Sequence, residues 1–271
     1  MCGIVGYIGN KQAPPVLIKG LKRLEYRGYD SAGVALNQDN EVFRLRSLGK
    51  VSSLEELMVN SKPKANSGIA HTRWATHGAP SEENAHPHGS HDEIYIVHNG
   101  IIENHDEIRD KLKSKGYNIA SETDSELIAH LIYLNKTDSI STLEALINAT
   151  KELKGAFSIA AISSKEKGKI YAAKQKSPLL IGEGIDENFI ASDPLAIANI
   201  TEKFYLLEDG DFAEISENDI KIFNSNGEPV KREETKIDAT PTSTSKGNYS
   251  HFMEKEIYEQ PDALGNTING R

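Results

Sequence analysis

The sequence of 271 residues contains a single cysteine, Cys2, so no disulfide bond can form within the chain. A chain of this length can bury a sizeable core without covalent crosslinks. Disulfides are common in secreted domains and rare in reducing compartments, although some extracellular domains also lack them. We therefore predict a cytoplasmic location.

Long apolar runs are also missing. The first residues, MCGIVGYIGNKQAPP, have no basic start, and glycines interrupt their apolar stretch. This pattern is not that of a signal peptide, and no segment has the length of a membrane span. We expect no association with a membrane.

Positive charge is in deficit, with 31 Lys and Arg against 40 Asp and Glu and a net charge of −9. A chain this acidic is repelled by nucleic acid and by anionic membrane surfaces. The composition therefore favours a small-molecule ligand and no nucleic-acid partner.

Two common cofactor signatures are absent as well. GYIGNK lacks the full pattern of a phosphate-binding loop. Seven of the nine histidines lie between His71 and His105, which raises a zinc-dependent hydrolase as an alternative. Their spacing matches neither a His-Glu-x-x-His helix nor a zinc finger, and one cysteine is too few for a finger. We predict no metal and no cofactor.

The chain does contain many short strand patterns separated by a few helical ones. About ten segments have an apolar period of two, and the helical patterns do not alternate regularly with them. This favours an α+β fold of antiparallel sheets with helices packed outside. The strand segments are residues 3–9, 31–36, 41–45, 68–74, 93–100, 155–163, 169–174, 187–192, 211–216 and 220–223, and the helical segments are 14–28, 52–58, 104–117, 123–134 and 141–155.

Local signals predict several helix ends. Arg27 and Gly28 are suited to a helix C-terminus. Ser52 or Ser53 with Glu55 or Glu56, and Thr123 with Glu126, match capping boxes. The polar stretch DATPTSTSKG divides the chain into a domain at residues 1–237 and a linker at 238–271, in which Pro261 should stop a last helix.

Cys2 lies one peptide bond from the amino terminus. After removal of Met1 it would carry a thiol and a free α-amine, and the amine could accept the proton of the thiol. Nucleophile and base would then belong to one residue, as in enzymes with an N-terminal threonine. An inert buried cysteine in the first strand is the alternative.

Three further motifs suggest binding chemistry. Asn99 and Gly100 form either a turn or an oxyanion hole. The segment HTRWATHG contains Arg73, Trp74, Thr76 and His77, which form either an ordinary strand end or a clamp for a carboxylate. Asp124, expected in the first turn of a helix, either stabilises the helix dipole or accepts an ammonium group.

The order of these motifs resembles the class II glutamine amidotransferases, a family of N-terminal-nucleophile hydrolases. The matching segments are MCGIVGYIG, LEYRGYDSAG, HTRWATHG, NAHPH, VHNGIIEN and SETDSE. Among them, LEYRGYDSAG favours the glutaminase domains of glutamine–fructose-6-phosphate aminotransferases over the amidotransferases of purine or asparagine synthesis. The resemblance runs to EKEIYEQP, which is similar to the connection to an isomerase part.

The resemblance implies a fold, a reaction and partners. The family fold is a four-layer αββα sandwich of two antiparallel sheets. The activity would be hydrolysis of L-glutamine to L-glutamate and ammonia, which C-terminal isomerase domains of the same chain would use to make glucosamine 6-phosphate. The full-length enzyme would be a homo-oligomer. A non-catalytic glutamine-binding module with an unprocessed terminus remains an alternative.

The resemblance also implies roles for the site residues. Cys2 would be the nucleophile, and Asn99 and Gly100 would hold the oxyanion. Arg73, with Thr76 and His77, would bind the carboxylate of glutamine, and Asp124 with the Gly100 carbonyl would bind its ammonium group. Trp74 would belong to a loop that closes over the substrate, and Arg27 would support the nucleophile's end of the chain.

Overall fold

The computed structural model describes residues 2–28, 30–38, 41–75, 78–236 and 249–268. The chain divides into two compact units, Met1–Ile237 and Asp238–Arg271. The second unit contains helix α7 (Phe252–Ile268). All of the strands described below belong to the first unit.

Across the described residues, the strands form two sheets whose neighbouring strands all pair antiparallel. The first sheet consists, in spatial order, of β15 (Glu234–Lys236), β11 (Lys203–Leu206), β9 (Leu180–Glu183), β10 (Glu187–Ala191), β1 (Gly3–Gly9), β4 (Ser67–Arg73), β2 (Ser31–Gln38) and β3 (Glu41–Leu48). The second consists of β14 (Pro229–Val230), β13 (Ile220–Phe223), β12 (Asp211–Ile215), β8 (Ile170–Gln175), β7 (Gly155–Ser163), β6 (Ile94–Ile102) and β5 (His88–Ser90).

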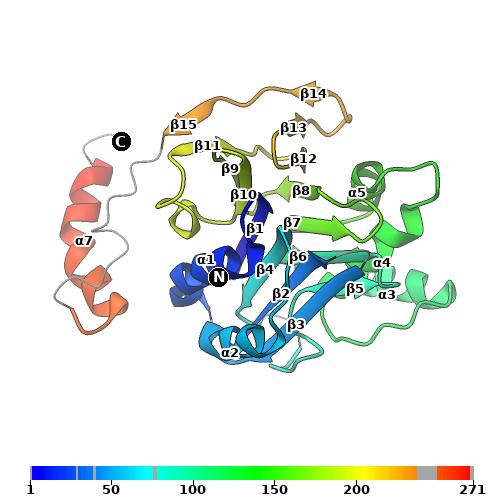
Figure 1. Cartoon of the computed structure of the whole chain (residues 1–271), viewed down its shortest axis with the longest axis horizontal. Helices are drawn as coiled ribbons and strands as arrows, with labels where there is room; N and C mark the ends of the chain where they lie inside the picture. Colours follow the sequence, from blue (N-terminus) through cyan, green and yellow to red (C-terminus); the bar gives the residue numbers. More distant parts are fainter. Residues whose placement is uncertain (1, 29, 39–40, 76–77, 237–248, 269–271) are drawn as a thin grey trace. The chain divides into compact units, whose positions relative to one another are not determined.

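Helices cover the outer faces of the two sheets (Figure 1). Helices α1 (Ala13–Leu24) and α2 (Val51–Ser61) share a buried apolar cluster with the first sheet. Helices α3 (His105–Ser114), α4 (Ser125–Asn135) and α5 (Thr142–Thr150) share another with the second. A third cluster lies between the sheets. The layers therefore follow the order helix, sheet, sheet, helix.

Strand β1 shows why the sequence produces this arrangement. All seven of its residues are buried. Val5 and Tyr7 pack toward the helices, whereas Ile4 and Ile8 pack between the sheets. Because side chains alternate along a strand, a strand that is apolar on both faces must be covered on both. This accounts for the central position of β1.

The structure confirms the predicted α+β fold of two antiparallel sheets with outer helices. All ten expected strands are present. Five described strands had escaped prediction: β5, β9, β11, β14 and β15. Each has at most four residues, which is too short for a period of two to stand out.

Two predicted caps are wrong in detail. Helix α2 begins at Val51, whose N–H donates to the Glu25 carboxylate at 2.7 Å, so the serines lie inside its first turn. At α4, Thr123 Oγ1 accepts from the Glu126 N–H at 3.3 Å. The Glu126 carboxylate instead binds the N–H groups of the preceding loop. The N–H at the start of α2 thus has a distant partner, Glu25, and the Glu126 carboxylate binds the loop before α4 and not the N-cap.

Two other helix ends also differ from expectation. Helix α1 ends at Leu24, and a 3₁₀ turn, Glu25–Arg27, continues to Gly28, whose N–H donates to the Glu25 carbonyl at 3.1 Å. Pro261 lies inside α7 and does not stop it. A proline removes one helical hydrogen bond, and the turns on either side can still form.

Candidate active site

Cys2 lies where strand β1 begins, beside the end of β4. Gly3 pairs with Thr72, and this register brings Cys2 next to Trp74. The Trp74 N–H donates to Cys2 Sγ at 3.2 Å, and the thiol contacts the Trp74 carbonyl at 3.5 Å. Burial raises the pKa of the Cys2 thiol, and the hydrogen bond from Trp74 offsets only part of this rise. The thiol therefore needs a base before it can act as a nucleophile.

A cavity of about 530 Å³ opens at Cys2. It lies between the two sheets, because its lining comes from Cys2 and β4 on one side and from β6 and β7 on the other. The lining residues are Cys2, His71, Arg73, Trp74, His86, His98, Asn99, Gly100, Ile101, Glu103, Thr123, Ser125, Ala156, Ser177 and Pro178.

Asn99 reaches Cys2 from the opposite sheet. Its Nδ2 donates to the Cys2 carbonyl at 3.1 Å, and its Oδ1 contacts His71 Nε2 at 2.9 Å. The predicted neighbours Cys2 and Asn99 are thus brought together across the interface between the sheets. The side-chain NH₂ group of asparagine has two hydrogens, so the second hydrogen on Nδ2 can be donated to another acceptor.

Gly100 follows Asn99 on β6 and has a φ of +137°, which favours glycine. A Cβ at this position would lie 2.0 Å from the carbonyl oxygen of Ala156 on β7. A glycine in an oxyanion hole has no side chain and lets a substrate approach closely. The structure supplies a second reason, because the neighbouring strand itself occupies the space.

Arg73 is the last residue of β4, and its side chain is buried. Its Nη2 donates to the Gly78 carbonyl at 3.1 Å and its Nη1 to the Ala79 carbonyl at 3.4 Å, with Asp30 3.9 Å away. Asp30 also accepts from the Ala75 N–H. The guanidinium thus holds the segment that follows Trp74.

Of the other predicted site residues, the structure describes some in full, some in part and some not at all. Trp74 is 57% exposed at the cavity. Thr76 and His77 lie outside the described residues. The backbone of Arg27 belongs to the 3₁₀ turn, and its side chain lies outside the described part.

Asp124 is the N-cap residue of α4, one position before its first turn. It is buried, with Oδ2 accepting from the Ile102 N–H at 2.8 Å and Oδ1 from the Ser125 hydroxyl at 3.3 Å. Its neighbours Thr123 and Ser125 line the cavity, whereas Asp124 does not. The carboxylate thus ties the start of α4 to the end of β6, directly behind the cavity.

Known proteins are similar to this chain in sequence. Residues 71–199 match a family model described as a glutamine amidotransferase domain. Glutamine–fructose-6-phosphate aminotransferases (isomerizing) from Vibrio parahaemolyticus and Pseudomonas aeruginosa are each 50% identical over all of this chain. This chain is similar to the glutamine amidotransferases. The chain spans 44% of the length of each of these two relatives.

Solved structures agree with this family. The glutamine phosphoribosylpyrophosphate amidotransferase of B. subtilis matches with a TM-score of 0.71 and 25% identity over 83% of this chain and 49% of its own. A glutamine aminotransferase class-II domain protein from Silicibacter pomeroyi has a TM-score of 0.56 at 15% identity, over 82% of this chain and 99% of its own. The second likeness concerns the fold alone.

Three histidines, His71, His86 and His98, line the Cys2 cavity, and His88 lies outside its lining. The rings of His71 and His86 stack at 4.0 Å, and His88 meets His86 edge-on at 4.7 Å. Burial lowers the pKa of His71 and of His88 to about 3 and lowers that of His86 as well. These imidazoles are therefore neutral at pH 7. Among the described residues, no group of three or more His, Cys, Asp or Glu side chains is arranged to hold a metal ion.

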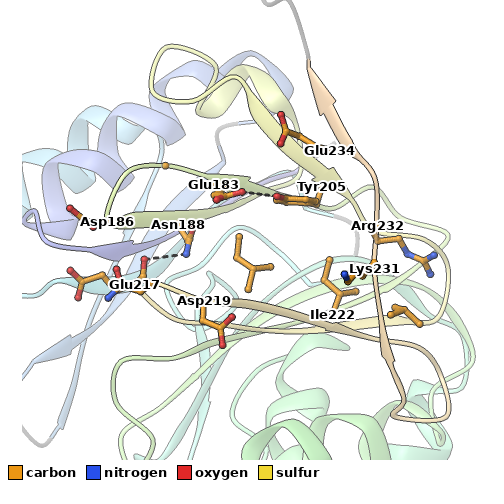
Figure 2. Close-up of a pocket in the computed structure, with 14 residues that line it drawn as sticks. Glu183, Asp186, Asn188, Tyr205, Glu217, Asp219, Ile222, Lys231, Arg232 and Glu234 are labelled. Carbon is orange, nitrogen blue, oxygen red and sulfur yellow. Dashed lines mark hydrogen bonds between the residues drawn. The ribbon is translucent and has the colours of Figure 1, made fainter.

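A second cavity of about 590 Å³ lies elsewhere in the first unit, between β9–β11 and β13–β14 (Figure 2). Its lining includes no cysteine, serine, threonine or histidine among the described residues. A hydrogen bond to Glu183 raises the pKa of Tyr205 to about 12, and Arg232 is paired with Asp211. Tyr205 and Arg232 are thus each engaged by a carboxylate of the protein itself.

No helix in the described part of the chain combines the length and the apolar character needed to cross a bilayer.

Proposed function

We propose that this chain hydrolyses L-glutamine to L-glutamate and ammonia, with Cys2 as the nucleophile. The observation that carries the proposal is the convergence of Cys2 and the Asn99 amide, from different sheets, on one cavity. The similarity of the chain to glutamine amidotransferases supports the same reaction.

The reaction proceeds through a thioester. The Cys2 thiolate attacks the side-chain amide carbon of glutamine, and the C=O electron pair moves onto oxygen to give a tetrahedral intermediate. Donors at Asn99 Nδ2 and the Gly100 N–H stabilise this oxyanion, and each is worth ~3 kcal/mol. Collapse of the intermediate expels ammonia, and water then cleaves the γ-glutamyl thioester to release glutamate.

The base is the α-amine of Cys2, which requires removal of Met1. The raised pKa of the buried thiol makes such a base necessary. His71, the cavity histidine that contacts Asn99, is neutral and bonds away from the thiol, through the Asn99 oxygen. After the amine has taken the thiol proton, it can pass this proton to the departing nitrogen.

Glutamine is recognised by its charged end. Arg73, with Thr76 and His77, binds the α-carboxylate, and Asp124 with the Gly100 carbonyl binds the α-ammonium group. The burial of Arg73 at the cavity supports its assignment, since a buried charge interacts more strongly with a ligand of opposite sign. The assignment of Asp124 rests on the resemblance, since Asp124 lies behind the residues that line the cavity. Trp74 covers the entrance, and Arg27 supports the nucleophile's end of the chain.

We further propose that the ammonia serves the conversion of fructose 6-phosphate to glucosamine 6-phosphate by C-terminal isomerase domains of a longer, homo-oligomeric enzyme in the cytosol. The names of the relatives and the share of their length that this chain spans support this destination. They favour it over a role in purine or asparagine synthesis.

The test compares glutamate release by the purified chain with that by Cys2→Ala, alongside the intact mass of each. We expect Cys2→Ala to be inactive and the active protein to lack Met1. Equal rates in the two proteins would disprove the nucleophile. Activity that resists a thiol alkylator and disappears with a chelator would instead support a zinc-dependent hydrolase, and absence of turnover with bound glutamine would support a binding module.

A further inference from the structure

His71 contacts the proposed oxyanion donor from behind. It lies on β4, opposite Ile4 of β1, in a strand that is buried throughout. Its Nε2 is 2.9 Å from Asn99 Oδ1 and 3.1 Å from the His98 carbonyl oxygen. The two hydrogen bonds cross from one sheet to the other.

The hydrogen-bond partners determine the tautomer of His71. A carbonyl oxygen can only accept, so Nε2 must carry a hydrogen and donate it. Since the ring is neutral, Nδ1 then carries none. The group that faces Nε2 on Asn99 must therefore be an acceptor, which assigns the amide oxygen to this side and Nδ2 to the Cys2 side.

On this basis we propose that His71 is a positioning residue that holds the Asn99 carboxamide in its catalytic orientation; the inference rests on the proposed glutaminase activity. If the amide rotated by half a turn, Nδ2 would face the N–H of His71, and Oδ1 would face both the Cys2 carbonyl and the developing oxyanion. Both contacts are repulsive. His71 thus excludes the orientation in which Asn99 would oppose the reaction.

A purely structural role explains the residue less well. Nδ1 of His71 is buried and has no hydrogen-bond partner among the described residues. An orphaned buried nitrogen is unfavourable, and a leucine of similar volume would avoid it. A donor at Nε2 is thus retained although Nδ1 is buried without a hydrogen-bond partner among the described residues.

The test measures steady-state glutaminase kinetics for wild type, His71→Leu, His71→Gln and His71→Asn. Glutamine can present its amide N–H near the position of Nε2, whereas asparagine is too short. We expect kcat to fall about 10- to 100-fold in His71→Leu and His71→Asn with KM within about 3-fold, because the donor to the oxyanion is lost. His71→Gln should recover most of kcat.

His88→Leu is the matched control. His88 is also buried, contacts the same His86 ring, and bonds Thr123 Oγ1 at 3.1 Å without touching Asn99. The kcat of His88→Leu should stay within about 3-fold of the wild-type value. Thermal unfolding of each variant identifies any that fail to fold. If His71→Leu fails to fold, the comparison of kcat between His71→Asn and His71→Gln still tests the positioning role.

A double-mutant cycle with Asn99→Ala separates the two proposals. If His71 acts through Asn99, adding His71→Leu to Asn99→Ala should change kcat by less than about 3-fold. A slow Asn99→Ala together with a normal His71→Leu would overturn the positioning role alone. A normal Asn99→Ala would overturn the oxyanion assignment and the positioning role together, and multiplicative losses would show that His71 acts on another group.

Discussion

Glu166 joins four elements of the second sheet and its helices, and its removal should weaken the fold in a pH-dependent way. It lies in the β7–β8 turn and accepts from Lys136 Nζ at 2.7 Å, from the Thr142 N–H at 2.8 Å and from its hydroxyl at 2.7 Å. Tyr171 on β8 donates to its other oxygen. Burial would raise the pKa of Glu166, but these bonds outweigh it and lower the pKa to about 2 from 4.5.

The magnitude follows from this difference in pKa. A gap of about 2.5 pH units corresponds to at most ~3.4 kcal/mol at 1.36 kcal/mol per unit. The side chain is 21% exposed, so solvent screening reduces this to about 1 to 2 kcal/mol. Because the folded pKa is the lower one, this stability is complete above about pH 5 and is lost as the pH falls toward 2.

Glu166→Gln tests this reasoning by chemical denaturation at pH 7 and pH 3. At pH 7 the free energy of unfolding should fall by about 2 kcal/mol, which lowers Tm by about 5 °C. At pH 3 less than half of the stabilisation by the ionised Glu166 carboxylate remains. The difference in free energy of unfolding between wild type and Glu166→Gln should therefore be about 1 kcal/mol smaller than at pH 7.

Glu55→Gln is the control, because its pair with Lys22 at 2.6 Å is exposed on both sides. This change should cost less than about 0.5 kcal/mol at pH 7. An equal gap between wild type and Glu166→Gln at both pH values would refute the link between the ionised carboxylate and stability.

The other predictions concern the site and one helix. Gly100→Ala should destabilise the fold by roughly 2 to 4 kcal/mol and abolish glutaminase turnover, since its Cβ would overlap the Ala156 carbonyl; a wild-type Tm would contradict this. Arg73→Lys should raise KM for glutamine about 10-fold with little change in kcat, because a point charge replaces a fork; steady-state kinetics with an unaltered KM would remove Arg73 from the carboxylate role. Ser141→Ala should cost about 1 kcal/mol in urea denaturation, because it breaks the capping box with Glu144, and an unchanged midpoint would show that the box contributes nothing.

Much of this fold could be predicted from the sequence because the information is local. The nearly continuous apolar character of β1 and β7 specifies strands that are covered on both faces, and the absence of regular strand–helix alternation specifies antiparallel sheets. The shortest strands could not be found this way. β14 has two residues, and its existence depends on the partner β13.

The candidate site could also be predicted only in part from the sequence. Cys2, Asn99 and Gly100 could be selected from the sequence because their chemistry belongs to the residue type and its neighbours. His71 could not, since a histidine in a buried strand has no local sign of its partner, and the resemblance gave no role to His71 although the segment HTRWATHG begins with it. The cluster of histidines suggested metal binding, whereas the structure shows neutral rings that stack and bond to amides and hydroxyls.

The sequence by itself determined the longer strands, the helices and the chemical identity of the proposed nucleophile, because these depend on residue type and short-range period. Only the tertiary structure decided which groups meet at the cavity. Cys2 and Asn99 are 97 positions apart in the sequence and come from different sheets. They are in contact because the two sheets pack face to face through the third apolar cluster. Burial between the sheets also decided that the thiol has a raised pKa and that the surrounding histidines are neutral.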